Sequence, residues 1–162
     1  STNIGALVSK PHLEKVQDYI NIAKEENGKI LYGGNKVTVE GYENGYYLEP
    51  TVIEVKTDDC RVNQEEIFGP VVTIMPFNSE DDVLQMANKV KYGLSATLWT
   101  NNLKRTMRLS NQLQAGIVWV NTWMMRDLRT PFGGVKASGV GREGGFEALR
   151  FFTEAKNVCI KY

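Results

Sequence analysis

The sequence has few of the residues that build metal centres and disulfide frameworks. It contains two cysteines, Cys60 and Cys159, which lie far apart, and a single histidine, His12. No group of Cys and His has the spacing of metal ligands, so we expect no metal site. Two distant cysteines do not form a disulfide framework either. This cysteine usage is typical of a reducing compartment, and we expect a cytoplasmic protein.

An excess of either charge and a long apolar run are also missing. The chain has 19 basic and 19 acidic residues, and no basic stretch stands out, so we expect no nucleic-acid partner. No apolar run approaches the roughly 18–20 residues that cross a bilayer, so we expect no membrane span. Residues 1–11 lack the basic-then-apolar order of a signal peptide. A hydrophobic content of 42% is ordinary for one globular domain.

A self-sufficient catalytic group is not recognisable. Cys60 adjoins two aspartates whose negative charges disfavour the thiolate, so it is a poor nucleophile candidate. Cys159 lies in an alternating segment and is expected to be structural. Residues 139–144 match G-x-G-x-x-G, but no strand directly precedes them and no ribose-binding acid follows at the required distance. His12 lies at the start of a predicted helix and is expected to be a solvated helix-end residue.

The middle of the chain is the most regular part. Its pattern predicts strands at 71–77, 94–99 and 117–121, with a helix after each of the first two. Ser79 with Asp82 favours a capped start for the first helix, and Asn101 or Asn102 for the second. Crossovers of this length join parallel strands, and continuous apolar runs are typical of strands covered on both faces. We therefore predict an α/β fold with a mostly parallel open sheet and helices on both faces.

The two ends of the chain give weaker patterns. Ser9 and Pro11 favour a helix start, and Asn27-Gly28 its end. Residues 46–55 read as a strand whose Pro50 suggests an edge position or a bulge. Residues 157–162 alternate and read as a terminal strand, which needs a sheet in this chain or in a neighbouring subunit.

The segment 121–134 is the candidate site, because ligands of open parallel sheets bind outside the carboxyl ends of the strands. It contains Arg126 and Arg129, and an arginine fork binds carboxylates with two hydrogen bonds. The alternative is that each arginine pairs within the chain. The acids available for such pairing are Asp127, Glu143 and Glu147.

Several motifs, in order, are similar to the carboxyl-terminal part of aldehyde dehydrogenases. They are EEIFGP at 65–70, YGLSATLWT at 92–100, GIVWVN at 116–121 and PFGGVKASGVGRE at 131–143, with IGALVSKPHLEKV near the start. The run WMMRDLRTPFGG at 123–134 resembles the branch of the family that acts on semialdehydes carrying a carboxylate, of the muconic type. The resemblance covers essentially the whole chain.

This resemblance implies roles for individual residues. Glu66 would hydrogen-bond the nicotinamide-ribose hydroxyls of NAD, with NADP not excluded, and Phe68 would pack beside that ribose. Phe132 and Trp123 would line the aldehyde tunnel. Arg126 would bind the substrate carboxylate at the far end of that tunnel.

The resemblance also implies a division of the polypeptide. Residues 1–155 would be the carboxyl-terminal part of the catalytic domain, and 156–162 an oligomerisation strand that joins the sheet of a partner in a homo-oligomer through 157–162. The family's catalytic cysteine, glutamate base and dinucleotide-binding domain precede this part, so we expect the chain alone to be inactive. The alternative function is a non-catalytic interaction module that assembles through its terminal strand.

Overall fold

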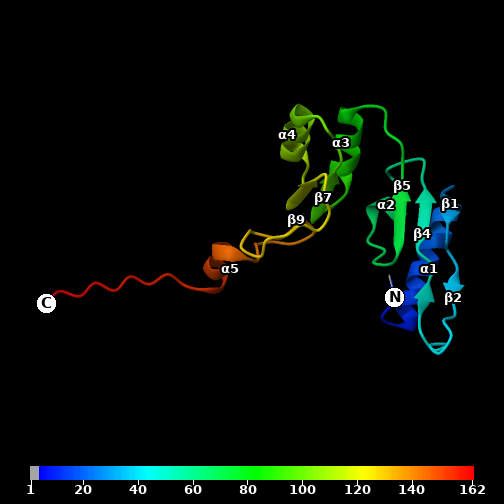
Figure 1. Cartoon of the computed structure of the whole chain (residues 1–162), viewed down its shortest axis with the longest axis horizontal. Coiled ribbons are helices and arrows are strands. Elements are labelled where there is room, and N and C mark those ends of the chain that lie inside the picture. The colour runs from blue at the N-terminus through cyan, green and yellow to red at the C-terminus, as the bar shows by residue number, and fades with distance from the viewer. Residues whose placement is uncertain (1–3) are drawn as a thin grey trace. The chain divides into compact units, whose positions relative to one another are not determined.

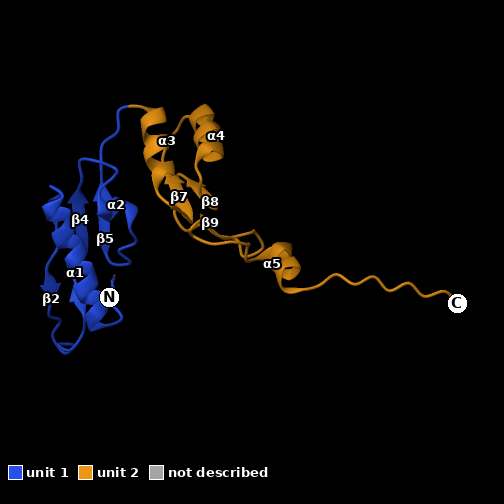
Figure 2. Ribbon diagram, turned by 180° about the vertical axis from the view of Figure 1, so that it is seen from behind, with its two compact units in different colours: residues 1–78 blue, residues 79–162 orange. Residues whose placement is uncertain are grey.

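The computed structural model describes residues 4–162, which form two compact units, residues 4–78 and 79–162 (Figure 2). Residues 1–3, part of the stretch considered above as a possible signal peptide, lie outside the described residues. The elements of the first unit are α1 (Lys10–Glu25), β1 (Lys29–Tyr32), β2 (Lys36–Val37), β3 (Tyr47–Leu48), β4 (Thr51–Glu54), α2 (Arg61–Gln64) and β5 (Val71–Ile74) (Figure 1). Those of the second are α3 (Glu80–Lys89), β6 (Tyr92–Gly93), β7 (Ser95–Leu98), α4 (Leu103–Gln112), β8 (Ile117–Val120), β9 (Val135–Lys136) and α5 (Gly145–Phe152).

Helix α1 supplies four of the nine described residues that are buried in the core cluster of the first unit. It begins at the expected place, because the Ser9 hydroxyl accepts a hydrogen bond from the His12 amide at 3.3 Å. It ends before Asn27, whose φ of 64° is a left-handed conformation that asparagine tolerates. The helix buries one stripe at helical spacing, made up of Leu13, Val16, Ile20 and Ala23. This stripe packs in one cluster with Leu48, Ile53, Val55, Val62 and Ile67.

The sheet of the first unit has the order β1-β4-β5, antiparallel and then parallel. β4 is its central strand, so the expectation that Pro50 marks an edge or a bulge is wrong. Pro50 lies just before β4 begins, where its missing N–H removes no bond from the ladder. Strands β2 and β3 form a separate antiparallel pair.

The second unit is built on β7 and β8, which pair in parallel from Ser95 opposite Ile117 to Leu98 opposite Val120. Both helices that surround this pair begin at the expected caps. The Ser79 hydroxyl accepts from the Asp82 amide, and the Asn102 side chain accepts from the Arg105 amide. Short strands β6 and β9 form an antiparallel pair.

The α/β class is confirmed. Within the first unit β5 pairs in parallel with β4, and within the second unit β7 pairs in parallel with β8. Periodicity identifies a strand but not its neighbours. β5 also exposes alternate residues, Val72 and Ile74, so it is covered on one face in the described residues.

After α5 the described chain contains neither helix nor strand (red in Figure 1). Val158, Ile160 and Tyr162 are all exposed. The assignment of 157–162 as an oligomerisation strand therefore stays a prediction. Among residues 4–162, no helix combines the length and hydrophobicity that a bilayer crossing requires.

Candidate functional site

The loop that leaves β8 starts from a fixed point. Asn121 follows the last residue of β8 and adopts a φ of 52°. Its side chain accepts a hydrogen bond from the Thr100 amide and donates one to the Thr100 carbonyl, both at 2.8 Å. Thr100 follows β7, so one asparagine ties the carboxyl ends of both parallel strands together. The candidate loop therefore begins at a clamped strand end, as expected from the sequence.

A buried tryptophan holds the middle of this loop. Trp119 of β8 is only 6% exposed, and its indole N–H donates to the Met125 carbonyl at 2.7 Å. Its ring also meets that of Trp123 edge-on, with centroids 5.2 Å apart. Trp123 itself is exposed. These contacts fix the backbone immediately before Arg126.

Arg126 is held by two groups from a later part of the chain. Its guanidinium lies 2.5 Å from the carboxylate of Glu143 and 4.1 Å from the ring centroid of Phe132. Phe132 and Glu143 are themselves joined, because each donates its amide to the carbonyl of the other, at 2.8 and 2.7 Å. The result is a compact cluster in which the guanidinium of Arg126 pairs with the carboxylate of Glu143 and stacks on the ring of Phe132.

The structure thus brings together two of the three expected substrate contacts, Arg126 and Phe132. Trp123 packs instead against Trp119. The internal pairing that the sequence left open is observed for both arginines, since Arg129 forms a forked pair with Asp127. The hydrogen bonds from Arg129 lower the pKa of the Asp127 carboxyl.

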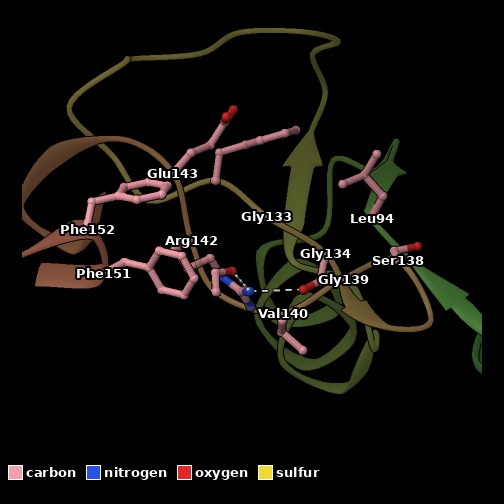
Figure 3. A pocket seen from close by; sticks show the side chains of 12 residues that line it. Leu94, Gly133, Gly134, Ser138, Gly139, Val140, Arg142, Glu143, Phe151 and Phe152 are labelled. Atoms are coloured by element: carbon pink, nitrogen blue, oxygen red, sulfur yellow. Dashed lines mark hydrogen bonds between the residues drawn. The ribbon is translucent and has the colours of Figure 1, made fainter. Parts of the chain in front are cut away.

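A pocket of about 330 Å³ lies beside the cluster in the second unit (Figure 3). Phe151 and Phe152 of α5 stand on one side and Leu94 on the other. The remaining wall is glycine-rich loop and includes Phe132, Gly133, Gly134, Ser138, Gly139, Val140, Gly141, Arg142 and Glu143. Arg142 is part of the wall, because its guanidinium donates to the carbonyls of Gly134 and Gly141.

One glycine beneath the pocket is required for packing. A Cβ on Gly116, just before β8, would lie 1.6 Å from the Gly133 carbonyl oxygen. The backbone of the PFGG turn therefore rests directly on the start of the strand. A side chain at position 116 would therefore displace this turn.

The second candidate region, residues 65–70, lies in the first unit. Phe68 is 74% exposed and Glu66 is also exposed. Within residues 4–162, no hydrogen bond or ion pair engages the Glu66 carboxylate. A free carboxylate can accept two hydrogen bonds, as a ribose diol requires, and the bare ring of Phe68 offers an apolar face. The residues present therefore fit the sugar of a nucleotide cofactor.

Helix α1 holds this loop from behind. Lys15 donates to the Glu66 carbonyl at 3.1 Å, and the His12 Nε2 lies 2.6 Å from the Phe68 carbonyl oxygen. Tyr19 donates to the Glu65 carboxylate at 2.7 Å, and this bond is the main reason why the pKa of Tyr19 is raised. His12 lies in the first turn of α1 as expected, but its side chain is half-buried and also contacts the loop, which the sequence did not predict.

Cys60 is a poor nucleophile candidate in the structure. Cys60 is half-buried and donates its thiol to the Thr57 carbonyl. Burial raises the pKa of Cys60, and the nearby charges of Glu26 and Asp58 raise it further, so the thiolate is disfavoured as the sequence predicts. In the part of the chain that the structure describes, no three His, Cys, Asp or Glu side chains gather as metal ligands would.

Comparison with known proteins gives a consistent result. The model of the Aldehyde dehydrogenase family matches residues 1–158. The chain is 48% identical to a 2-aminomuconic 6-semialdehyde dehydrogenase of Pseudomonas sp, over 99% of this chain and 33% of that protein. It is 46% identical to a 2-hydroxymuconic semialdehyde dehydrogenase of Pseudomonas sp. (strain CF600), over 98% of this chain and 33% of the relative.

A solved NAD⁺ complex of an aldehyde dehydrogenase from Bacillus cereus superposes with a TM-score of 0.88 at 44% identity. The superposition covers 94% of this chain and 30% of the Bacillus cereus chain. The chain thus spans about a third of the length of the relatives it matches. With nearly all of its residues matched, the chain belongs to the aldehyde dehydrogenase family.

Proposed function

We propose that this chain supplies one third of an NAD-dependent aldehyde dehydrogenase that oxidises a semialdehyde carrying a carboxylate, of the muconic type. The observation that carries the proposal is Arg126, stacked on Phe132 and already engaged with a carboxylate. The names of the two relatives above support the substrate class, and they favour an enzyme over an interaction module.

On the substrate side, Arg126 anchors the distant carboxylate of the semialdehyde. Its side chain is 32% exposed, so an anion can reach it from solvent, while the ring of Phe132 fixes its plane. Phe132 forms an apolar wall for the carbon chain, and Trp123 adds a second one. Their task is to hold the aldehyde carbon in a defined place, because orientation lowers the barrier of the chemical step.

On the cofactor side, Glu66 accepts hydrogen bonds from the nicotinamide ribose and Phe68 packs beside it. When bound, the nicotinamide accepts the hydride from the substrate. An exposed hollow next to the Phe68 ring, lined by residues 4–7 and 68–70, gives room for a group of this size. NADP would make the same contacts here, since its additional phosphate lies on the other ribose.

We infer that the nucleophile and the base come from the remaining two thirds of the enzyme, because Cys60 is disfavoured as a thiolate. The chain alone is therefore inactive. Residues 1–155 complete a catalytic domain, and 156–162 pair with a neighbouring subunit of a homo-oligomer. The exposed apolar side chains of β5 and α5 support the view that further polypeptide covers them. The cysteine usage favours the cytoplasm.

A chimera tests this proposal. These residues replace the aligned third of the 2-aminomuconic 6-semialdehyde dehydrogenase of Pseudomonas sp, and NADH formation is followed. We expect the chimera to oxidise a carboxylate-bearing semialdehyde and the isolated chain to show no activity. Arg126→Ala in the chimera should raise KM for the carboxylated substrate about tenfold or more and leave a neutral aldehyde unaffected. Equal effects on both substrates would remove Arg126 from substrate recognition.

A further inference from the structure

The cofactor-facing loop 65–70 is tied to one face of α1. His12, Lys15 and Tyr19 are spaced by three and four residues, so they project from the same side of the helix. Each of the three holds a different residue of the loop, namely Phe68, Glu66 and Glu65. In the first two cases the helix binds the backbone carbonyl. The side chains of Phe68 and Glu66 are therefore left exposed.

His12 makes the shortest of these contacts. A carbonyl oxygen only accepts hydrogen bonds, so the Nε2 of His12 must carry the hydrogen in the 2.6 Å contact with Phe68. Either the neutral Nε2–H tautomer or the imidazolium satisfies this requirement. The edge of the imidazole also meets the Phe68 ring, with centroids 6.1 Å apart.

The residue that His12 holds has an unusual backbone. Phe68 has a φ of 58°, in the left-handed region that side chains with a Cβ rarely adopt and that persists only where the surroundings impose it. The next residue, Gly69, is pressed against α1, since a Cβ there would lie 2.7 Å from a Val16 methyl group. The helix therefore imposes the turn that displays the ring.

We propose that His12 is a positioning residue for the cofactor: its hydrogen bond to the Phe68 carbonyl sets the direction in which Phe68 and Glu66 face the nicotinamide ribose. This inference rests on the proposed function of the loop. His12 acts on the loop and not on the fold, because the helix cap uses the His12 backbone amide and the core uses Leu13 and Val16. Replacing the side chain leaves both in place.

The first test uses the chain as it is and needs no activity. Hydrogen–deuterium exchange is measured over 64–72 for the original chain, His12→Ala and His12→Gln. The amide of Val71 bonds to the Gly69 carbonyl, so it reports the order of the turn. We expect about fivefold faster exchange in His12→Ala, the factor that one net hydrogen bond represents.

The glutamine variant should restore protection, because its amide nitrogen reaches about as far as Nε2. Lys10→Ala is the matched control: Lys10 lies in the same helical turn but pairs with Glu14, and its loss should change nothing. Unaltered exchange in His12→Ala would overturn the inference, as would glutamine behaving like alanine.

The second test measures the NAD dissociation constant of the chimera by calorimetry. We expect about fivefold weaker binding in His12→Ala, with recovery in His12→Gln. Original and alanine chimeras that bind NAD equally well would overturn the positioning role while leaving the proposed function intact. If the folded chimera fails to bind NAD whether residue 12 is His, Ala or Gln, the proposed function is refuted, and the role of His12 with it.

Discussion

Arg126 and Glu143 form an ion pair at 2.5 Å on a platform that the pair shares with Phe132. The side chain of Glu143 is 62% exposed, so its carboxylate returns to water readily when another anion takes its place. Surface ion pairs of this kind contribute little to stability, about 0–1 kcal/mol. If Arg126 binds the substrate carboxylate as proposed, Glu143 would compete with the substrate for the same guanidinium.

Removing the internal competitor should tighten substrate binding. In the chimera, Glu143→Gln keeps the size and backbone bonds of residue 143 but removes its charge. We expect KM for a carboxylate-bearing semialdehyde to fall about threefold, because the substrate no longer displaces an ion pair worth under about 1 kcal/mol. KM for a neutral aldehyde should stay constant. Steady-state kinetics with both substrates measure the difference.

Arg129→Ala is the control for this prediction, since Arg129 forms an ion pair with Asp127 in the same loop. It should change neither KM value. If Glu143→Gln raises KM for the carboxylated substrate, then Glu143 assists Arg126 and does not compete with it.

Local features of the fold were predictable from the sequence because they depend on a few neighbouring residues. The caps at Ser9, Ser79 and Asn102 each rest on a side chain and an amide three residues apart. The partner of β5 was not predictable in the same way. A strand that alternates or runs apolar can pair with any other strand, and its observed partner β4 contributes Ile53 to the core cluster around α1.

The candidate site likewise has features that the sequence predicts and features that it does not. Arg126 was identified because arginine in a strand-end loop is chemically informative, but its pairing with Glu143 joins residues that no periodicity relates. The contact of His12 with the Phe68 carbonyl could not be predicted, because its partner is a backbone carbonyl 56 positions away and every residue has one. The spacing of His12, Lys15 and Tyr19 on one helical face was the signal available.

Replacing Asn121 should lower the stability of the second unit. Asn121→Ala removes two hydrogen bonds to Thr100. It also puts alanine at a φ of 52°, a left-handed conformation that asparagine tolerates better. We expect a loss of about 2 kcal/mol in the free energy of unfolding. Asn121→Gly removes the same bonds without the backbone strain and should lose about 1 kcal/mol.

Urea unfolding followed by tryptophan fluorescence measures this loss, because all three tryptophans, Trp99, Trp119 and Trp123, belong to the second unit. A glycine variant less stable than the alanine variant would show that the left-handed backbone does not matter here.

The two cysteines should differ in reactivity and in their effect on stability with pH. Cys159 is exposed, whereas burial raises the pKa of Cys60, so iodoacetamide should modify Cys159 first near pH 8. The folded chain keeps the Cys60 proton to higher pH than the unfolded chain does. Stability should therefore fall as pH rises above the unfolded value of about 8.5, until the folded thiol also ionises.

Mass spectrometry of the alkylated chain identifies the modified residue, and Cys60→Ala should flatten the alkaline decline seen in unfolding curves. Faster alkylation at Cys60 than at Cys159 would contradict the disfavoured thiolate, and it would reopen the question of a nucleophile within this chain.

The terminal segment 157–162 should control assembly. Its apolar residues Val158, Ile160 and Tyr162 alternate and are all exposed, as required of a strand that completes another sheet through backbone hydrogen bonds. We expect the chimera to be an oligomer, and deletion of 157–162 to reduce its mass to that of a smaller species in sedimentation equilibrium.

Ile160→Asp should act in the same direction, because a charge on the inward side opposes burial. Lys161→Ala, one position along and therefore on the opposite side of a strand, is the matched control and should leave the mass unaltered. If the shortened chimera keeps its full mass, the subunits associate through another surface, and the segment has no part in assembly.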